Sequence, residues 1–362
     1  MIFLVLVALT ACSTRADSFP VLEGIHPTAS VRVPSRPTES VTPGVALQQT
    51  QTPTSTPEPV STPGSVTLMA VGDIMLGRTV GERIINDGPG VVFTGVQTIL
   101  SSADLLVGNL ECTITDQGQP GPKSYTFAAP PISAEALGMA GFDLINLGNN
   151  HSLDYGLIGL TQTQELLSAN GITSIGIGLG DQAAGPVIFE KNGLRIAFLS
   201  YVDVPEELKG FDARDWIASD NVQGIAWATL ENVQTGVAAA KQLADVVIVF
   251  MHFGFEGNEL PVREQREDAI AAIDAGASAV IGSHPHLLQH VEEYRGALIA
   301  YSLGNFVFDD FDMPENRSAI LRLSLNQEGM VSYDWFPVII ANGLPTMASP
   351  EQANEIFRML AP

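Results

Sequence analysis

Short apolar runs alternate with amphipathic stretches along residues 66–345. The apolar runs have the length of buried strands and are rich in Val, Ile, Leu and Ala. We expect strands at Val66–Val71, Asp104–Val107, Leu144–Leu147, Arg195–Ser200, Val246–Met251, Ala279–Gly282, Leu298–Tyr301, Ala319–Leu325 and Val331–Ile340. Apolar residues recur three and four positions apart in Ile132–Ala140, Leu157–Ala169, Leu230–Ala244 and Val262–Ala275, which predicts helices. This alternation indicates an α/β layered fold.

Two local patterns refine this picture. Asn192-Gly193 lies between two strand-like segments within Phe189–Ile196, so we expect a hairpin and a partly antiparallel sheet. Residues 346–362 form a separate C-terminal unit, in which Pro350–Pro362 is predicted as one amphipathic helix packed on the domain.

The chain begins with a short apolar segment that ends at Cys12. Residues 1–12 have the length of the apolar part of a signal peptide and are too short to span a bilayer. Leu9-Thr10-Ala11-Cys12 resembles the bacterial lipobox, in which the cysteine is lipidated and becomes the new N-terminus. We therefore predict a lipoprotein signal peptide and an extracytoplasmic protein anchored to the cell membrane through Cys12. A buried N-terminal strand or helix is the alternative.

Residues 13–65 have the composition of a disordered tether. Eight Ser, nine Thr and nine Pro make up 26 of these 53 residues, and no hydrophobic period is present. Such a segment buries too little apolar surface to offset the entropy of ordering it. It would hold the folded domain away from the membrane.

Charge and cysteine content exclude several functions. The net charge of −23 leaves no basic surface for a nucleic acid. The folded part, residues 66–362, has 36 acidic and 14 basic residues and so carries −22 of that charge. Two cysteines, Cys12 and Cys112, cannot build a disulfide framework or a thiolate zinc cluster.

Polar residues gather where the predicted strands end. In layered α/β folds, the carboxyl ends of the strands border the crevice that binds ligands. Four of the six histidines follow strands, and so do carboxylates and amides; the set is Asp73, Asn109, Glu111, Asn149, Asn150, His151, His252, His284, His286 and Asn305. Imidazole, carboxylate and amide ligands suit Zn, Mn or Fe, so these residues predict a divalent metal site.

Six motifs resemble those of the CapA/PgsA family of capsule and poly-γ-glutamate biosynthesis proteins. In chain order they are Val71–Arg78, Gly108–Glu111, Gly148–His151 with Asp154–Gly156, Met251–Gly254, Gly282–His286 and Tyr301–Phe306. The resemblance covers about residues 66–310. It implies the calcineurin-like metallophosphoesterase fold, a four-layer α-β-β-α sandwich of two mixed sheets.

The resemblance also implies roles for individual residues. Asp73 and His286 would bind a first metal, and Glu111 would bridge it to a second. Asn150, His252 and His284 would bind the second metal. His151 would be the general acid that protonates the leaving group, with Asp154 orienting its imidazole, while metal-bound water attacks.

This chain departs from the superfamily at Met75. A phosphoesterase of this type has Asp-x-His, whereas this sequence has Asp73-Ile74-Met75. A thioether is a poor ligand for these metals, so the first position lacks one ligand and one bound metal is the safer expectation.

Two basic residues and an amide lie in the motif regions. Arg78, Lys123 and Asn109 are predicted to bind substrate, the two cations by clamping a carboxylate or phosphate. Ordinary surface ion pairs are the alternative for Arg78 and Lys123. Glu256 and Glu259, which follow His252, could line the site or be solvated charges, and the second interpretation is preferred. Trp216 and Trp227 lie in a polar insertion, residues 203–228, that is a candidate cover for the crevice.

The preferred interpretation is a surface-anchored, metal-dependent hydrolase or transferase in the production of poly-γ-glutamate or a related envelope polymer. A non-catalytic assembly or export factor and a genuine phosphoesterase stay open as alternatives. The expected partners are an anionic envelope polymer or its precursor, the membrane through the N-terminal lipid, and a membrane-embedded polymer synthase. Because the polymer and the domain are both negatively charged, capture would depend on the metal and on a few nearby cations.

Overall fold

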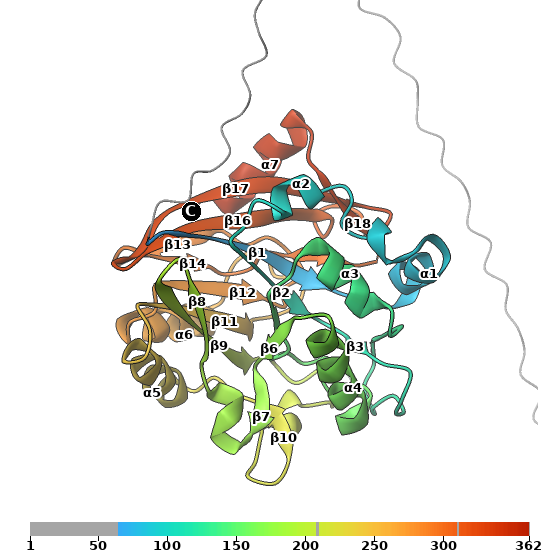
Figure 1. Ribbon diagram of the computed structural model, residues 1–362, viewed down its shortest axis with the longest axis horizontal. Helices are drawn as coiled ribbons and strands as arrows, with labels where there is room; N and C mark the ends of the chain where they lie inside the picture. The colour runs from blue at the N-terminus through green and yellow to red at the C-terminus, as the bar shows by residue number, and fades with distance from the viewer. Residues whose placement is uncertain (1–63, 208–209, 310, 362) are drawn as a thin grey trace, which may run out of the picture. The chain divides into compact units, whose positions relative to one another are not determined.

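The computed structural model describes residues 64–361, except 208, 209 and 310 (Figure 1). The predicted signal peptide, Cys12 and the tether as far as residue 63 therefore lie outside the described residues. Gly64 and Ser65 lead directly into the first strand.

Two mixed sheets form the centre of the domain. The first has the order β18-β17-β16-β1-β2-β5-β6, and β15 also pairs with β1. Its strands are β1 (Val66–Ile74), β2 (Leu105–Leu110), β5 (Leu144–Asn146), β6 (Thr173–Ile175), β15 (Asn305–Val307), β16 (Arg317–Asn326), β17 (Gly329–Ala341) and β18 (Leu344–Met347). The second has the order β13-β14-β12-β11-β9-β8. Its strands are β8 (Val187–Lys191), β9 (Leu194–Asp203), β11 (Val246–Phe253), β12 (Ala279–Ser283), β13 (Val291–Tyr294) and β14 (Ala297–Ala300).

Helices cover the outer faces of both sheets (Figure 1). The first sheet carries α1 (Arg78–Asp87), α2 (Gln97–Leu100), α3 (Ser133–Ala140) and α4 (Gly156–Ala169). The second carries α5 (Leu230–Lys241) and α6 (Arg263–Asp274). The C-terminal helix α7 (Pro350–Leu360) adds Ile356 and Leu360 to the core between the sheets.

The alternation of side chains along β1 and β11 explains the layers. In β1, Met69 and Val71 pack with the helices of the first sheet, whereas Leu68 and Ala70 face the other sheet. In β11, Ile248 lies in this inter-sheet core, and its neighbours in the strand face α5 and α6. Both faces of each central strand are therefore apolar, which is why these strands read as continuous apolar runs. The predicted four-layer sandwich is confirmed.

The first strand is longer than its apolar run. We expected a loop from Gly72, but β1 continues to Ile74 because β15 pairs with it in parallel at Asp73 and Asn305. A Cβ atom at Gly72 would lie 1.9 Å from the carbonyl oxygen of Gly304, so only glycine fits here. The pairing is therefore set by a segment more than two hundred residues away in sequence.

The predicted hairpin is confirmed, since β8 and β9 are antiparallel and Asn192 and Gly193 both have positive φ. The short pairs β3 (Thr113–Ile114) with β4 (Ala128–Ala129), and β7 (Ile177–Leu179) with β10 (Gln223–Ile225), were not expected. The boundary drawn at residue 345 falls inside β18. In the described part of the chain, no helix combines the length and the apolar character that crossing a bilayer requires.

Candidate metal centre

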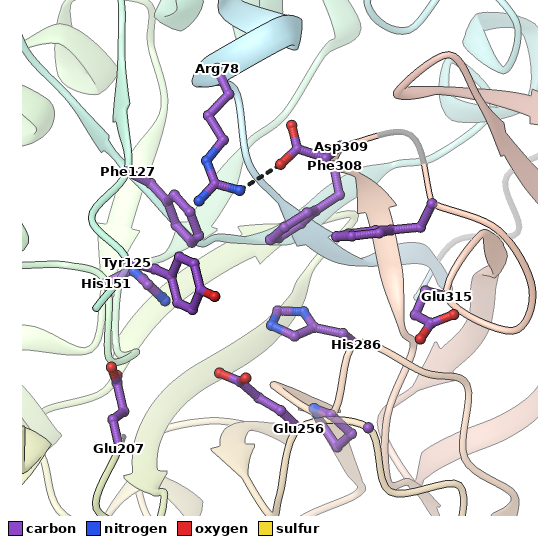
Figure 2. Close-up of a pocket in the computed structure, with 13 residues that line it drawn as sticks. Arg78, Tyr125, Phe127, His151, Glu207, Glu256, His286, Phe308, Asp309 and Glu315 are labelled. Atoms are coloured by element: carbon purple, nitrogen blue, oxygen red, sulfur yellow. Dashed lines mark hydrogen bonds and ion pairs between the residues drawn. The ribbon is translucent and has the colours of Figure 1, made fainter. Parts of the chain in front are cut away.

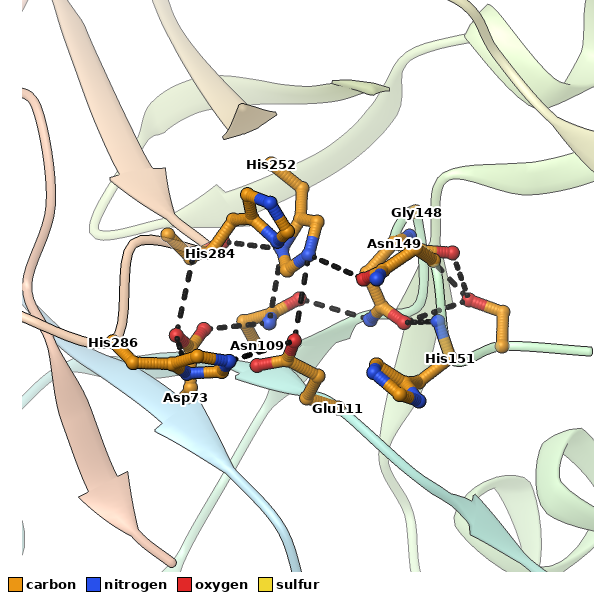
Figure 3. Close-up of polar contacts among 12 residues, drawn as sticks. Asp73, Asn109, Glu111, Gly148, Asn149, His151, His252, His284 and His286 are labelled. Carbon is orange, nitrogen blue, oxygen red and sulfur yellow. Dashed lines mark hydrogen bonds and ion pairs between the residues drawn. The ribbon is translucent and has the colours of Figure 1, made fainter. Parts of the chain in front are cut away.

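The predicted ligands converge at one edge of the two sheets (Figure 3). Asp73 lies near the end of β1, Asn109 near the end of β2, and His252 near the end of β11. Glu111 follows β2, Asn150 and His151 follow β5, and His284 and His286 follow β12. All of these residues except the half-buried His286 are buried. The strand-end argument therefore places the residues correctly.

Two groups of three side chains have the spacing of metal ligands. Asp73, Glu111 and His286 form one group, and Glu111, His252 and His284 form the other, with the ligand atoms of each group within 4.8 Å of one another. Glu111 belongs to both, with Oε1 3.5 Å from His252 Nε2 and 3.8 Å from His286 Nε2. This is the geometry that a bridging carboxylate needs.

Asn150 completes the second group. Its Oδ1 atom lies 2.9 Å from His252 Nε2, the same nitrogen that lies 3.5 Å from Glu111 Oε1. The other ring nitrogen of His252 lies 2.8 Å from Ser283 Oγ. The second group thus contains two imidazoles, one carboxylate and one amide oxygen.

Asn109 is buried and serves the structure of the centre. Its Nδ2 donates to Asp73 Oδ1 at 2.8 Å, and its Oδ1 accepts from the amides of Asn146 and Asn149. Because donor and acceptor are both used within the protein, this geometry favours a role in orienting Asp73 over the substrate contact predicted for Asn109.

Several ligand atoms have no hydrogen-bond partner within the described residues. Both carboxylate oxygens of Glu111 and both ring nitrogens of His284 are buried without a hydrogen-bond partner in this part of the chain. Such atoms carry a desolvation penalty unless something satisfies them. A divalent cation would do so, and imidazole, carboxylate and amide ligands fit Mn, Zn or Fe.

The pKa values in the centre reflect the same crowding. Burial raises the pKa of Glu111 well above its usual range, and the charges of Asp73 and Glu256 add to this effect. Burial lowers the pKa of His252 and His284, as do the neighbouring histidines. Burial also acts to lower the pKa of His286, but contact with Asp73 outweighs it and the pKa is raised. Neutral imidazoles at the second group are the form that binds metal.

His151 and Asp154 form a pair beside this centre. His151 Nδ1 lies 2.7 Å from Asp154 Oδ2, and the same oxygen accepts from the backbone nitrogen of Phe127 at 2.7 Å. The rings of Phe127 and His151 are stacked with centroids 4.3 Å apart. Burial lowers the pKa of His151, while Asp154 acts in the opposite direction. The imidazole is therefore held in one orientation at the cavity wall.

Lys123 is not placed as a substrate contact. Its side chain is fully buried, with Nζ 3.2 Å from Asp154 Oδ1 and 3.1 Å from Glu207 Oε1. The rings of Phe211 and Trp216 lie against the ammonium at 4.6 and 5.2 Å. The insertion 203–228 therefore packs on Lys123, and Trp216 and Trp227 are absent from the lining of the cavities described below.

Met75 belongs to the hydrophobic core. It is fully buried, and its sulfur accepts a contact from the backbone nitrogen of Gly77 at 3.1 Å. The first group accordingly has three protein ligands, Asp73, Glu111 and His286, compared with four in the second.

A cavity of about 450 Å³ opens beside the centre (Figure 2). Arg78 is the basic residue in its lining, and its NH1 atom pairs with Asp309 at 2.6 Å, above the ring of Phe127. A second cavity of about 320 Å³ shares Tyr125, Glu207 and Glu256 with the first. The walls are aromatic and acidic: Tyr125, Phe127, Phe308, Phe311, Glu207, Glu256, Asp309 and Glu315.

Some of these residues were missed by sequence reasoning. Glu256 lies next to His286 in Figure 2, although it was interpreted as a solvated charge. Glu207 lies in a segment without a strand-end motif, and Phe308 lies just beyond one. Phe308 could have been found, because it follows Tyr301–Phe306 by two residues and is apolar at the end of a strand.

Similar folds occur among solved structures. The NAD nucleotidase (NadN) of Haemophilus influenzae is 12% identical with a TM-score of 0.45, covering 82% of this chain and 62% of that one. A putative 5'-nucleotidase from Staphylococcus aureus is 14% identical with a TM-score of 0.44, covering 82% of this chain and 58% of that one.

Sequence comparison gives closer relationships. The chain is 34% identical over 294 residues to the PGA biosynthesis protein CapA of Bacillus subtilis (strain 168). The alignment covers 79% of this chain and 74% of the relative. The chain is 31% identical over 304 residues to the capsule biosynthesis protein CapA of Bacillus anthracis, covering 82% and 72%. The family model described as "Bacterial capsule synthesis protein PGA_cap" matches residues 67–310. The chain therefore belongs to the bacterial capsule synthesis protein family.

Proposed function

We propose that this protein is a divalent-metal-dependent hydrolase or transferase that acts on an anionic envelope polymer, such as poly-γ-glutamate or its precursor. The names of its relatives in two Bacillus species support the substrate class. The observation that carries the metal dependence is the set of buried, unpartnered ligand atoms on Glu111 and His284.

The second position is the main binding site for the metal. Glu111, Asn150, His252 and His284 would hold the cation there, and Asp73, Glu111 and His286 would hold another at the first position. A bound divalent cation would lower the pKa of a water molecule and polarise the bond to be cleaved. His151 lines the cavity with its Nδ1 held by Asp154. When the ring is doubly protonated, Nε2 is the atom that would donate a proton to the leaving group.

Arg78 is proposed to bind a carboxylate of the substrate. Its guanidinium is partly exposed and lines the cavity, and Asp309 holds it in place until a substrate carboxylate competes for it. The acidic residues around the cavity oppose capture of a polyanion. Binding should therefore strengthen when divalent cations are added and weaken when they are removed.

Metal content tests the proposal. Elemental mass spectrometry on the wild type, His252→Ala and His284→Ala should find bound metal in the wild type and its loss in both variants. His290→Ala, at a histidine outside the centre, is the matched control and should retain the metal. His151→Asn should also retain the metal but lose turnover of poly-γ-glutamate. A wild-type protein that takes up neither Mn nor Zn would overturn the metal dependence.

A non-catalytic assembly or export factor is the second candidate. The core position of Met75 favours it, because the first group keeps only three ligands and a two-metal reaction needs both positions. In that case His151→Asn would bind metal and support polymer production as well as the wild type does. If the protein is a phosphoesterase, the wild type should instead cleave a generic phosphodiester faster than the His252→Ala variant does.

The N-terminal anchor is a separate proposal. We infer from the lipobox-like Leu9–Cys12 and the Pro/Ser/Thr-rich segment after it that Cys12 is acylated and holds the domain outside the cytoplasmic membrane, beside a membrane-embedded synthase. Mass spectrometry of the N-terminal peptide should find the lipid on Cys12, and Cys12→Ser should release the protein from the membrane fraction.

A further inference from the structure

We propose that Glu207 is a positioning residue that fixes the amide orientation of Asn150, so that the oxygen of this amide faces the second metal position. This inference rests on the proposed function, because it concerns a ligand of the proposed metal. Glu207 lies in the insertion 203–228, outside the six motifs.

The contacts of Asn150 are divided between its two amide atoms. Nδ2 donates to Glu207 Oε1 at 2.8 Å, and Oδ1 lies 2.9 Å from His252 Nε2. An ionised carboxylate can only accept hydrogen bonds, so it selects the Nδ2 side of the amide. The oxygen is then directed to the opposite side, toward His252. A rotated amide would present N–H groups to the cation.

Lys123 holds the Glu207 carboxylate, which accepts from the Asn150 amide, in place. Its Nζ lies 3.1 Å from the same Glu207 Oε1 and also donates to the backbone oxygen of Asn150. Phe211 and Trp216, from the same insertion, cover the ammonium. A buried cation with no access to water keeps its carboxylate partners close. Lys123 therefore links the insertion to the loop that carries Asn150 and His151.

The same lysine connects the metal position to the proton donor. Lys123 Nζ contacts both Glu207 and Asp154, and Asp154 orients His151. The buried ammonium of Lys123 thus contacts both supporting carboxylates. The first, Glu207, orients a metal ligand, and the second, Asp154, orients the imidazole. The insertion therefore acts as a support for the centre.

The test is a comparison of Glu207→Gln in two backgrounds, with Mn²⁺ affinity of the full chain measured by electron paramagnetic resonance. Glutamine has nearly the same shape as glutamate, but it can donate as well as accept, so the amide of Asn150 is no longer forced into one orientation. We expect about tenfold weaker Mn²⁺ binding, in the range for residues that orient metal ligands. Glu206→Gln removes the same charge one residue away and should change the affinity by less than about threefold.

The second background is Asn150→Asp, in which the ligand oxygen is present on both sides. In this background Glu207 faces the carboxylate introduced at position 150. Glu207→Gln replaces that repulsion with an amide N–H that can donate to the new carboxylate. The same substitution should therefore strengthen Mn²⁺ binding in this background. If Glu207 acts by orienting the amide, the change in Mn²⁺ affinity caused by Glu207→Gln should have opposite signs in the two backgrounds. A general effect on folding would not reverse the sign. Circular dichroism monitors the folding of each variant.

The outcomes separate the two proposals. Weaker binding in both backgrounds, or equal loss in Glu206→Gln, would overturn the positioning role while leaving the metal site in place. A wild-type chain that binds no Mn²⁺ would overturn the proposed function and this inference together.

Discussion

The carboxylate of Asp154 contacts His151 and Lys123 with different oxygens. Oδ2 lies 2.7 Å from His151 Nδ1, and Oδ1 lies 3.2 Å from Lys123 Nζ. Both partners are buried, as is Asp154 itself. The carboxylate therefore contributes to the stability of the domain as well as to the orientation of the imidazole.

Asp154→Asn should destabilise the domain. The substitution removes one of the two negative partners of a buried ammonium, which costs about 2–4 kcal/mol when the charge cannot reach water. Urea denaturation would measure the loss, with the exposed Asp116→Asn as the control. A loss below about 1 kcal/mol would mean that the ammonium gains water or another partner in the variant.

Met75→His should add a ligand to the first metal position. An imidazole at this place in Asp73-Ile74-Met75 would complete the pattern of the superfamily, and its volume is close to that of the thioether it replaces. We expect the metal content after dialysis to rise from about one toward about two equivalents per chain, because a fourth ligand strengthens binding. Met75→Leu is the matched control. Equal metal content in the two variants would contradict the expectation.

The stability of the domain should depend on the protonation of Asp268, in α6. Burial, the charge of Asp203 and a hydrogen bond with Asp203 raise the pKa of Asp268 to about 7. An aspartate in the unfolded chain ionises near pH ~4, so between these values the folded state binds more protons. The contribution of this group to stability is therefore complete below pH ~4 and is lost as the pH rises to about 7.

Asp268→Asn should remove this dependence. At pH 8 the variant should be more stable than the wild type by about 2 kcal/mol, and the two should converge near pH 4. Urea denaturation at several pH values in this range measures the difference in the free energy of unfolding between the two proteins. Contributions from the metal centre cancel in this difference, because both proteins contain the same centre. A difference in stability between the two proteins that does not change with pH would contradict this prediction.

Gly72→Ala should disrupt the pairing of β1 with β15. The new Cβ would lie 1.9 Å from the carbonyl oxygen of Gly304, so the backbone of one segment must move. We expect a loss of about 3 kcal/mol or more in the free energy of unfolding, together with weaker metal binding through Asp73. Gly121→Ala places its Cβ 3.5 Å from the oxygen of Asp154, an ordinary contact, and should cost much less.

The sequence predicts the central strands and the clustering of the ligands because both depend on local patterns. The apolar runs at β1 and β11 are continuous since both faces of these strands are buried. The polar residues at their ends then meet by topology alone. Elements of two or three residues, such as β3 and β4, carry too little pattern to be recognised.

The remaining features depend on contacts between distant segments. The extension of β1 to Ile74 depends on β15, and the burial of Lys123 depends on Glu207, Phe211 and Trp216 from the insertion. A lysine in a motif region was expected to reach a substrate, because its covering residues cannot be identified from their spacing. Glu256 was interpreted as a surface charge for the same reason.

The place of Glu111 in both ligand groups has a thermodynamic consequence. Two cations that share one carboxylate cannot bind independently, since the first fixes the rotamer of Glu111 and neutralises its repulsion with Asp73, while its own charge opposes the second. The coupling free energy is reciprocal, so a cation at the first position changes the affinity of the second by the same factor as a cation at the second changes that of the first. Metal titrations of this protein should therefore be fitted with a linked two-site isotherm, and the occupancy of each position will depend on the total supply of cations.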